Sequence, residues 1–168
     1  IIFPIRKARG KNMIFYIFYI ILIFLAIFLA TKISIADMRH RIIPDIYLFP
    51  LMLIGLCFTT FFPYPITTSD GVIGAVFGYI TTTLIGFIFQ QFVHKHKTYA
   101  HPAIGMGDIK LISVGGIWLG IYGLSIALII SCVCGAIWAH FNHARYIPFA
   151  PFFIFGGFLS FIGLFFLL

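Results

Sequence analysis

The sequence predicts an all-α fold, a polytopic membrane protein built as a bundle of about six transmembrane helices. Hydrophobic residues make up 62% of the 168 residues, charged residues make up only 9%, and the mean hydropathy is +1.12. Several uncharged runs are long enough to cross a bilayer. A chain of this length accommodates about six spans of roughly 20 residues, but no water-soluble domain besides. We therefore expect the lipid bilayer to surround most of the protein.

Turn residues divide the apolar sequence into six expected spans. Pro44 and Asp45 open the second span, and the prolines of the FPYP segment end it. The GMGD segment begins the fourth span, and Gly120 with Gly123 marks a tight turn into the fifth. In chain order, the expected spans cover residues 14–36, 44–62, 71–93, 108–119, 124–141 and 151–168.

The charges of the connecting loops predict the orientation. Basic residues gather in the loops after the first, third and fifth spans, whereas the two other loops carry only Asp70. By the positive-inside rule the basic loops face the cytoplasm, which predicts a multi-pass protein of the cytoplasmic membrane. Residues 1–12 conflict with this layout because they place four basic residues on the expected outer side. We interpret residues 1–12 as upstream or added sequence, or as the remnant of a longer protein, and residues 13–168 as one membrane-embedded domain.

The net charge of +7 does not indicate a nucleic-acid partner, because the basic residues lie between apolar segments, where they set orientation. The three cysteines lie inside apolar runs and lack the spacing of zinc ligands. Five histidines of the basic loops offer a metal site as one interpretation and a solvated, lipid-facing surface as another. These histidines are His94, His96, His101, His140 and His143. The lipid-facing surface is the commoner use, and we expect neither a metal nor a cofactor.

Two of the four carboxylates, Asp37 and Asp108, stand at the cytoplasmic ends of long apolar segments. Ionisable groups at membrane depth are costly and usually functional, so two of them on one side of the membrane suggest a catalytic dyad. Small residues recur on the helix face that leads to each acid, and close packing of the two helices would bring the acids together. An alternative stays open, in which Asp108 caps its own helix and Asp37 pairs with Arg39 or Arg41.

Three segments resemble the signatures of the type IV prepilin peptidases and the archaeal preflagellin peptidases. The segment SIADMRHRIIPD resembles the first signature, an Asp followed seven residues later by Pro and then by Asp or Asn. The segment GMGDIKL resembles the second, GxGD followed by Lys two residues on. The segment IPFAPFFIFGG resembles the Pro-containing opening of the last helix. The three occur in the family's order, and the resemblance covers roughly residues 14–168.

The resemblance implies an aspartic protease of the membrane, with Asp37 and Asp108 as its catalytic residues. Such enzymes remove the short basic leader peptide of prepilins, pseudopilins or archaellins at the cytoplasmic face, so these proteins are the expected partners. Many bacterial members also methylate the new N-terminus of the pilin and carry a cysteine-rich segment that this chain does not show. We therefore expect a peptidase without methyltransferase activity. The exact substrate, a bacterial or archaeal origin, and the oligomeric state stay open.

The matching segments also imply residues that bind the substrate or shape the site. Gly105 and Gly107 would let an extended substrate backbone approach the neighbouring acid. Pro148 and Pro151 would shape the entry to the last helix. Lys110 has two interpretations of equal weight. It either tunes the nearby acid or holds the substrate, or it simply extends its charge to the membrane surface.

Two rival functions come from other classes. A small proton-coupled transporter would place its acids near the bilayer midplane and would show repeated halves, whereas these acids lie near one interface and no repeat is evident. A catalytically inactive pilus-assembly relative would lose one acid, whereas both are present. The GAVFG segment leaves a further choice open, because Gly74 and Gly78 form a pattern that serves either dimerisation or packing within the bundle.

Overall fold

The computed structural model describes residues 6–94, 104–142 and 147–167, and these residues form five helices and no strand. The helices are α1 (Arg6–His40), α2 (Asp45–Phe61), α3 (Thr68–His94), α4 (Met106–Asn142) and α5 (Phe149–Leu167). Three stretches, Phe15–His40, Thr68–Gln91 and Met106–Asn142, are long and apolar enough to cross a membrane, and α2 and α5 are shorter apolar helices. The prediction of an all-α, polytopic membrane protein is confirmed. The count of six spans is not confirmed.

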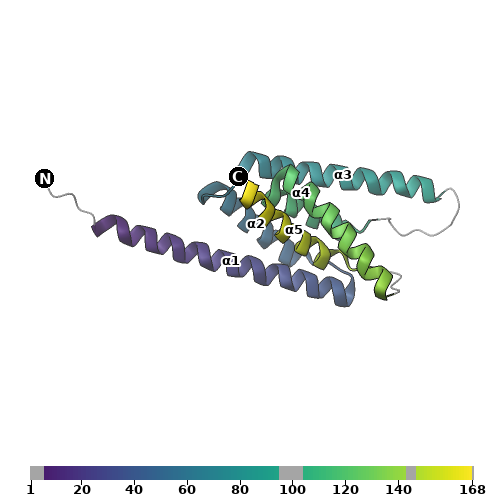
Figure 1. The fold of residues 1–168 in the computed structure, drawn as a ribbon, viewed down its shortest axis with the longest axis horizontal. Coiled ribbons are helices and arrows are strands. Elements are labelled where there is room, and N and C mark those ends of the chain that lie inside the picture. The colour runs from purple at the N-terminus through teal and green to yellow at the C-terminus, as the bar shows by residue number, and fades with distance from the viewer. Residues whose placement is uncertain (1–5, 95–103, 143–146, 168) are drawn as a thin grey trace.

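The helix α1 lies on one side of the bundle and α3 on the other, with α2, α4 and α5 between them (Figure 1). The main partner of α3 is α4, while α1 packs against α2 and α5. We call the end at which α1 stops and α4 starts the site end. The opposite end, at which α2 turns into α3, is called the distal end.

The expected fourth and fifth spans are the two helical arms of α4, which meet at a reversal of the chain at Gly120 (Figure 1). Gly120 has φ 63° and ψ −173°, a backbone conformation that is almost confined to glycine. The reversal brings side-chain atoms of Ile112 and Leu124 within 3.1 Å and 2.9 Å of the point that a Cβ on Gly78 would occupy. A straight helix would separate these two residues by about 18 Å along its axis. The turn predicted at Gly120 is therefore present, and it joins the two helical arms of α4.

Glycines let α3 and the first arm of α4 touch backbone to backbone. A Cβ on Gly116 would lie 2.4 Å from the carbonyl carbon of Gly74, and a Cβ on Gly74 would lie 2.7 Å from the carbonyl oxygen of Gly116. Gly78 faces the same interface, between the two arms of α4. Of the two uses left open for the glycine pattern of α3, the structure shows packing within the bundle.

The helix α1 is longer than the expected span of residues 14–36, and it carries Asp37 inside its last turn. Its deeply buried stripe runs through Leu29, Ile33 and Asp37, at intervals of four residues. A helix of 35 residues is about 52 Å long, which exceeds the hydrocarbon core of about 30 Å. Residues 6–12 continue α1, and the interpretation of residues 1–12 as a separate stretch stays a prediction.

Asp70 belongs to α3 and not to the loop in which the sequence predicts it. The hydroxyl of Thr67 donates to Asp70 Oδ2 at 2.7 Å, and the N–H of Asp70 donates to Thr67 Oγ1 at 3.2 Å. The second of these bonds is the usual cap of a helix N-terminus, in which a Thr oxygen accepts from the backbone N–H three residues later. The acid is exposed at the distal end, where its structural role is the cap itself.

Candidate active site

The N-terminus of α5 holds Asp37 in place. Asp37 is only 5% exposed, and its Oδ2 accepts a hydrogen bond of 2.7 Å from the backbone N–H of Ala150. The first N–H groups of a helix lack partners within the helix and carry partial positive charge, so a carboxylate binds well there. The acid of α1 is thereby tied to a helix that follows it by 113 residues.

The prolines of the last segment stand on either side of that donor. α5 begins at Phe149, so Pro148 precedes the helix and Pro151 lies in its first turn, where a missing N–H costs little. Ala150 lies between them and keeps its N–H for Asp37. This placement fits a role in shaping the entry to α5. That role stays a prediction, since neither proline lines the cavity described below.

The chain leaves α1 sharply just after Asp37. Arg41 has φ 54°, the left-handed conformation that often ends a helix, and its N–H donates to the backbone oxygen of Asp37 at 2.9 Å. Pro44 is extended and stands at the N-cap of α2, and no side chain caps this helix. Asp45 is therefore the first residue of α2. We call residues 41–44 the connector.

Asp108 lies half-buried in the first turn of α4, where the two glycines of GMGD surround it closely. The N–H of Asp108 donates to the carbonyl oxygen of Gly105 at 3.1 Å. A Cβ on Gly105 would lie 3.2 Å from Oδ2 of Asp108, and a Cβ on Gly107 would lie 3.0 Å from the Cβ of Ile43. Gly105 thus keeps the space beside the carboxylate free, and Gly107 lets the connector approach α4.

One cavity of about 340 Å³ is lined by both acids. α1 contributes Asp37, the start of α4 contributes Asp108, and the two carboxylates are close enough for their charges to interact. The remaining wall comes from residues 105–107, from the connector, from Ile147 and from the first residue of α5. Two carboxylates on one cavity can activate a water molecule and polarise a carbonyl group, which is the chemistry of aspartic proteases.

Lys110 points to a third acid. Its Nζ lies 2.6 Å from Oδ2 of Asp45, and both side chains are partly exposed. Lys110 does not line the cavity that Asp37 and Asp108 share. The sequence singled out Lys110 and placed Asp45 at the start of the second span, but it did not predict their pairing across 65 residues. Sequence reasoning also missed the cavity wall formed by Ile43, whose only signal is an apolar residue within a polar segment.

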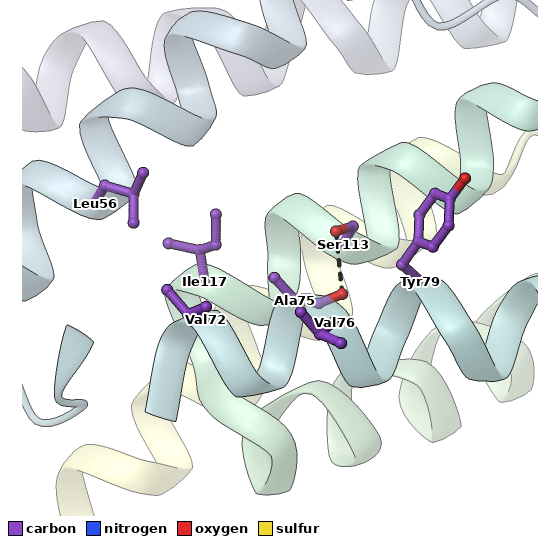
Figure 2. Close-up of a pocket in the computed structure, with 7 residues that line it drawn as sticks. All are labelled: Leu56, Val72, Ala75, Val76, Tyr79, Ser113 and Ile117. Carbon is purple, nitrogen blue, oxygen red and sulfur yellow. Dashed lines mark hydrogen bonds between the residues drawn. The ribbon is translucent and has the colours of Figure 1, made fainter. Parts of the chain in front are cut away.

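A second cavity, of about 390 Å³, lies among α2, α3 and α4 (Figure 2). It is lined by Leu56, Val72, Ala75, Val76, Tyr79, Ser113 and Ile117. The hydroxyl of Ser113 is already engaged, since it donates to the carbonyl oxygen of Ala75 at 3.1 Å. This cavity is slightly larger than the first, but its lining offers no acid, base or activated nucleophile. The chemistry therefore points to the cavity of the two acids.

Most of the loop histidines lie outside the described residues. His96, His101 and His143 fall in the segments 95–103 and 143–146, and nothing is described of the His94 side chain. Within the described part of the chain, no group of three potential metal ligands comes together. The absence of a metal stays a prediction for the whole chain.

The type IV leader peptidase family matches residues 20–140. The prepilin leader peptidase/N-methyltransferase of Xanthomonas campestris pv. campestris is 31% identical over 132 residues, which are 74% of this chain and 44% of that protein. The protein of the same name from Pseudomonas aeruginosa is 28% identical over 134 residues, or 76% of this chain and 44% of that protein.

The type 4 prepilin-like proteins leader peptide-processing enzyme of Escherichia coli is 32% identical over 127 residues, which are 74% of this chain and 45% of that protein. The chain thus spans less than half the length of these curated relatives. No solved structure matches. Since the family match covers well over half of the 168 residues and includes both acids of the cavity, the chain belongs to the type IV leader peptidase family.

Proposed function

We propose that this protein is a membrane aspartic endopeptidase that cleaves the leader peptide of prepilins, pseudopilins or archaellin-like proteins, with Asp37 and Asp108 as its catalytic residues. One observation carries the proposal: the two acids come from different helices, 71 residues apart in the sequence (108 − 37), and line one cavity. Family membership and the names of the relatives support the same activity.

The chemistry needs both carboxylates at once. Two acids held close together resist double ionisation, so the pair shares one proton. The ionised carboxylate takes a proton from a water molecule as that water attacks the scissile carbonyl carbon. The protonated carboxyl hydrogen-bonds the carbonyl oxygen and then helps to transfer a proton to the leaving amine. The water supplies the new bond, and no covalent intermediate with the protein forms.

The surroundings of the cavity support cleavage of a peptide at the boundary between an apolar helix and a polar leader. It opens beside the connector, where α1 ends and basic residues begin. Arg39 and Arg41 stand next to Asp37, which by the positive-inside rule supports a cytoplasmic site in the inner membrane. A substrate whose leader precedes a membrane helix would present its cleavage site at this depth. Gly105 supports this use, since it leaves space for a substrate backbone beside Asp108.

We assign cleavage, and not methylation, to these residues. The two carboxylates that line the cavity suit the activation of water for hydrolysis. Mass spectrometry of a processed substrate separates the two activities, since methylation adds about 14 Da to the new N-terminus while cleavage alone does not. A methylated product formed by this chain and a methyl donor would contradict the assignment.

Coexpression with a candidate prepilin tests the dyad. Asp37→Asn and Asp108→Asn keep the shape and the hydrogen-bond acceptor of each side chain but remove the ionisable group. We expect each variant to slow cleavage by about 10²–10⁴-fold, read as loss of the gel shift of the substrate. Asp70→Asn is the matched control at the distal end and should cleave normally. Full activity of either dyad variant, or a wild-type chain that leaves every prepilin intact, would overturn the proposal.

A further inference from the structure

We propose that Lys110 and Asp45 are a pair of positioning residues, whose contact fixes the connector against α4 and so sets the separation of Asp37 and Asp108. The inference rests on the proposed function, because it concerns how the same site is held. It assigns to Lys110 neither contact with the substrate nor contact with Asp108.

The ion pair joins the two sides of the cavity. Lys110 lies two residues after Asp108 on α4, and Asp45 follows the connector, whose first residue lies four positions after Asp37. The 2.6 Å contact between Nζ and Oδ2 therefore links the element that carries one acid to the element that follows the other.

A second contact lies on the same face of α4. Gly107 precedes Lys110 by one helical turn, and a Cβ on Gly107 would lie 3.0 Å from the Cβ of Ile43. Ile43 is 8% exposed and belongs to the buried core. The connector thus meets α4 through Ile43, and the residue that follows the connector meets α4 through the ion pair, while α5 holds Asp37 from the other side through Ala150. Loss of the ion pair would leave the apolar contact as the one described contact of this stretch with α4, and the connector could then shift relative to Asp108.

Because both side chains of the pair are partly exposed, the pair should matter more for the geometry of the site than for the stability of the fold. The side chains of Lys110 and Asp45 are 40% and 47% exposed, and ion pairs with this exposure contribute little to folding. Catalysis is far more sensitive to position, since a displacement of about 1 Å can cost roughly 100-fold in rate. Breaking the pair should therefore lower activity much more than stability.

The test breaks the pair from each side and then rebuilds it in reverse. Lys110→Met and Asp45→Ala should each lower kcat about tenfold with little change in KM, and the double variant should be no worse than either single one. The exchanged pair, Lys110→Glu with Asp45→Lys, should recover most of kcat. A lysine that binds the substrate would raise KM and would be indifferent to Asp45. A lysine that tunes Asp108 would shift the pH profile and would not be rescued by the exchange. Either result would overturn the proposal.

Lys32→Met is the matched control for removing a lysine, since Lys32 lies over the ring of Phe28 on the exposed face of α1. It should leave kcat unchanged. Asp45→Asn keeps an acceptor for Lys110 and should lose less activity than Asp45→Ala.

A second measurement does not depend on cleavage. The N–H of Tyr47 donates to the carbonyl oxygen of Pro44 at 3.2 Å, so hydrogen exchange at this amide reports on the junction of the connector and α2. Exchange there should accelerate at least about threefold in Lys110→Met and return in the exchanged pair. If wild type fails to cleave while exchange behaves as expected, the proposed function is wrong, but the contact between Lys110 and Asp45 does fix the connector. If wild type cleaves while neither exchange nor kcat changes on loss of the pair, the proposed positioning role is wrong.

Discussion

At the distal end the bundle closes around aromatic rings, whereas at the site end it closes around carboxylates and a cavity. Phe58 is 1% exposed and packs its ring against Phe62, Tyr64 and Trp118. The polar atoms there are satisfied, since the Tyr64 hydroxyl donates to the Trp118 carbonyl at 2.8 Å and the Trp118 indole N–H donates to the Leu51 carbonyl at 3.2 Å. Burial, with a smaller effect of Tyr19, raises the pKa of the Tyr64 phenol well above its ordinary value, so the hydroxyl stays a donor.

At the site end, by contrast, Asp37 is buried and Asp108 half-buried beside about 340 Å³ of open space. The directed contacts described there are the hydrogen bond from the Ala150 N–H to Asp37 and the ion pair of Lys110 with Asp45. We therefore expect the distal end to contribute mainly to stability and the site end to set the geometry of the reaction. Changes at the distal end and in the glycine interface should affect folding, whereas changes at the site end should affect the reaction.

The largest effect on stability is expected from the glycine interface between α3 and α4. In Gly116→Ala the new Cβ would lie 2.4 Å from the carbonyl carbon of Gly74, and two helix backbones would have to separate. Overpacking of this kind should destabilise the fold by about 3 kcal/mol, measured as the midpoint of unfolding by SDS in mixed micelles. Gly163→Ala is the control, because nothing lies within 4 Å of its Cβ, and it should change stability by less than about 0.5 kcal/mol. Equal stability of the two variants would contradict the packing described for α3 and α4.

A smaller effect is expected at Gly107, and it should act on kcat and not on stability. Gly107→Ala places a Cβ 3.0 Å from the Cβ of Ile43, so the connector must move by a few tenths of an ångström. We expect kcat to fall about tenfold, while the unfolding midpoint changes little. Gly157→Ala, whose Cβ would make an ordinary 3.6 Å contact with Leu119, is the control and should cleave like wild type. A loss of stability without a loss of kcat would remove the distinction between the two ends.

The smallest effect is expected from Tyr64→Phe at the distal end. The change removes the 2.8 Å hydrogen bond to the Trp118 carbonyl and keeps the ring contacts. The cost should be about 1 kcal/mol in the free energy of unfolding, with cleavage per folded molecule unchanged. A reduced kcat in folded protein would show that the distal end takes part in the reaction.

Hydropathy and the scarcity of charge in the sequence predicted several helices and the two acids of the cavity. Hydropathy predicts α2 and α3 to within a few residues, because an apolar run must be helical in a bilayer. The scarcity of charge singles out Asp37 and Asp108, which the structure brings to one cavity. Close packing between the two helices that carry the acids was also expected, and this is wrong among the described residues, because Gly116 packs against Gly74 of α3 while α1 packs against α2 and α5.

Contacts between distant residues could not be predicted in the same way. The pairing of Lys110 with Asp45 depends on how α2 and α4 pack, and no local pattern encodes that arrangement. The sequence predicts the turn at Gly120, but it does not predict that the chain reverses there without a loop between the two helical arms. Likewise, α1 continues through the polar residues 6–12, which hydropathy assigns to no span.

The hydrogen bond between Ala150 and Asp37 has a consequence for the timing of synthesis. A ribosome adds about 5–20 residues per second, so the 113 residues between the two partners take roughly 6–20 s to make. Throughout that interval α1 already carries its carboxylate, but the helix terminus that binds it does not yet exist. The order of translation therefore acts as a delay, and the acid of α1 is held in its final position only once α5 has joined the bundle.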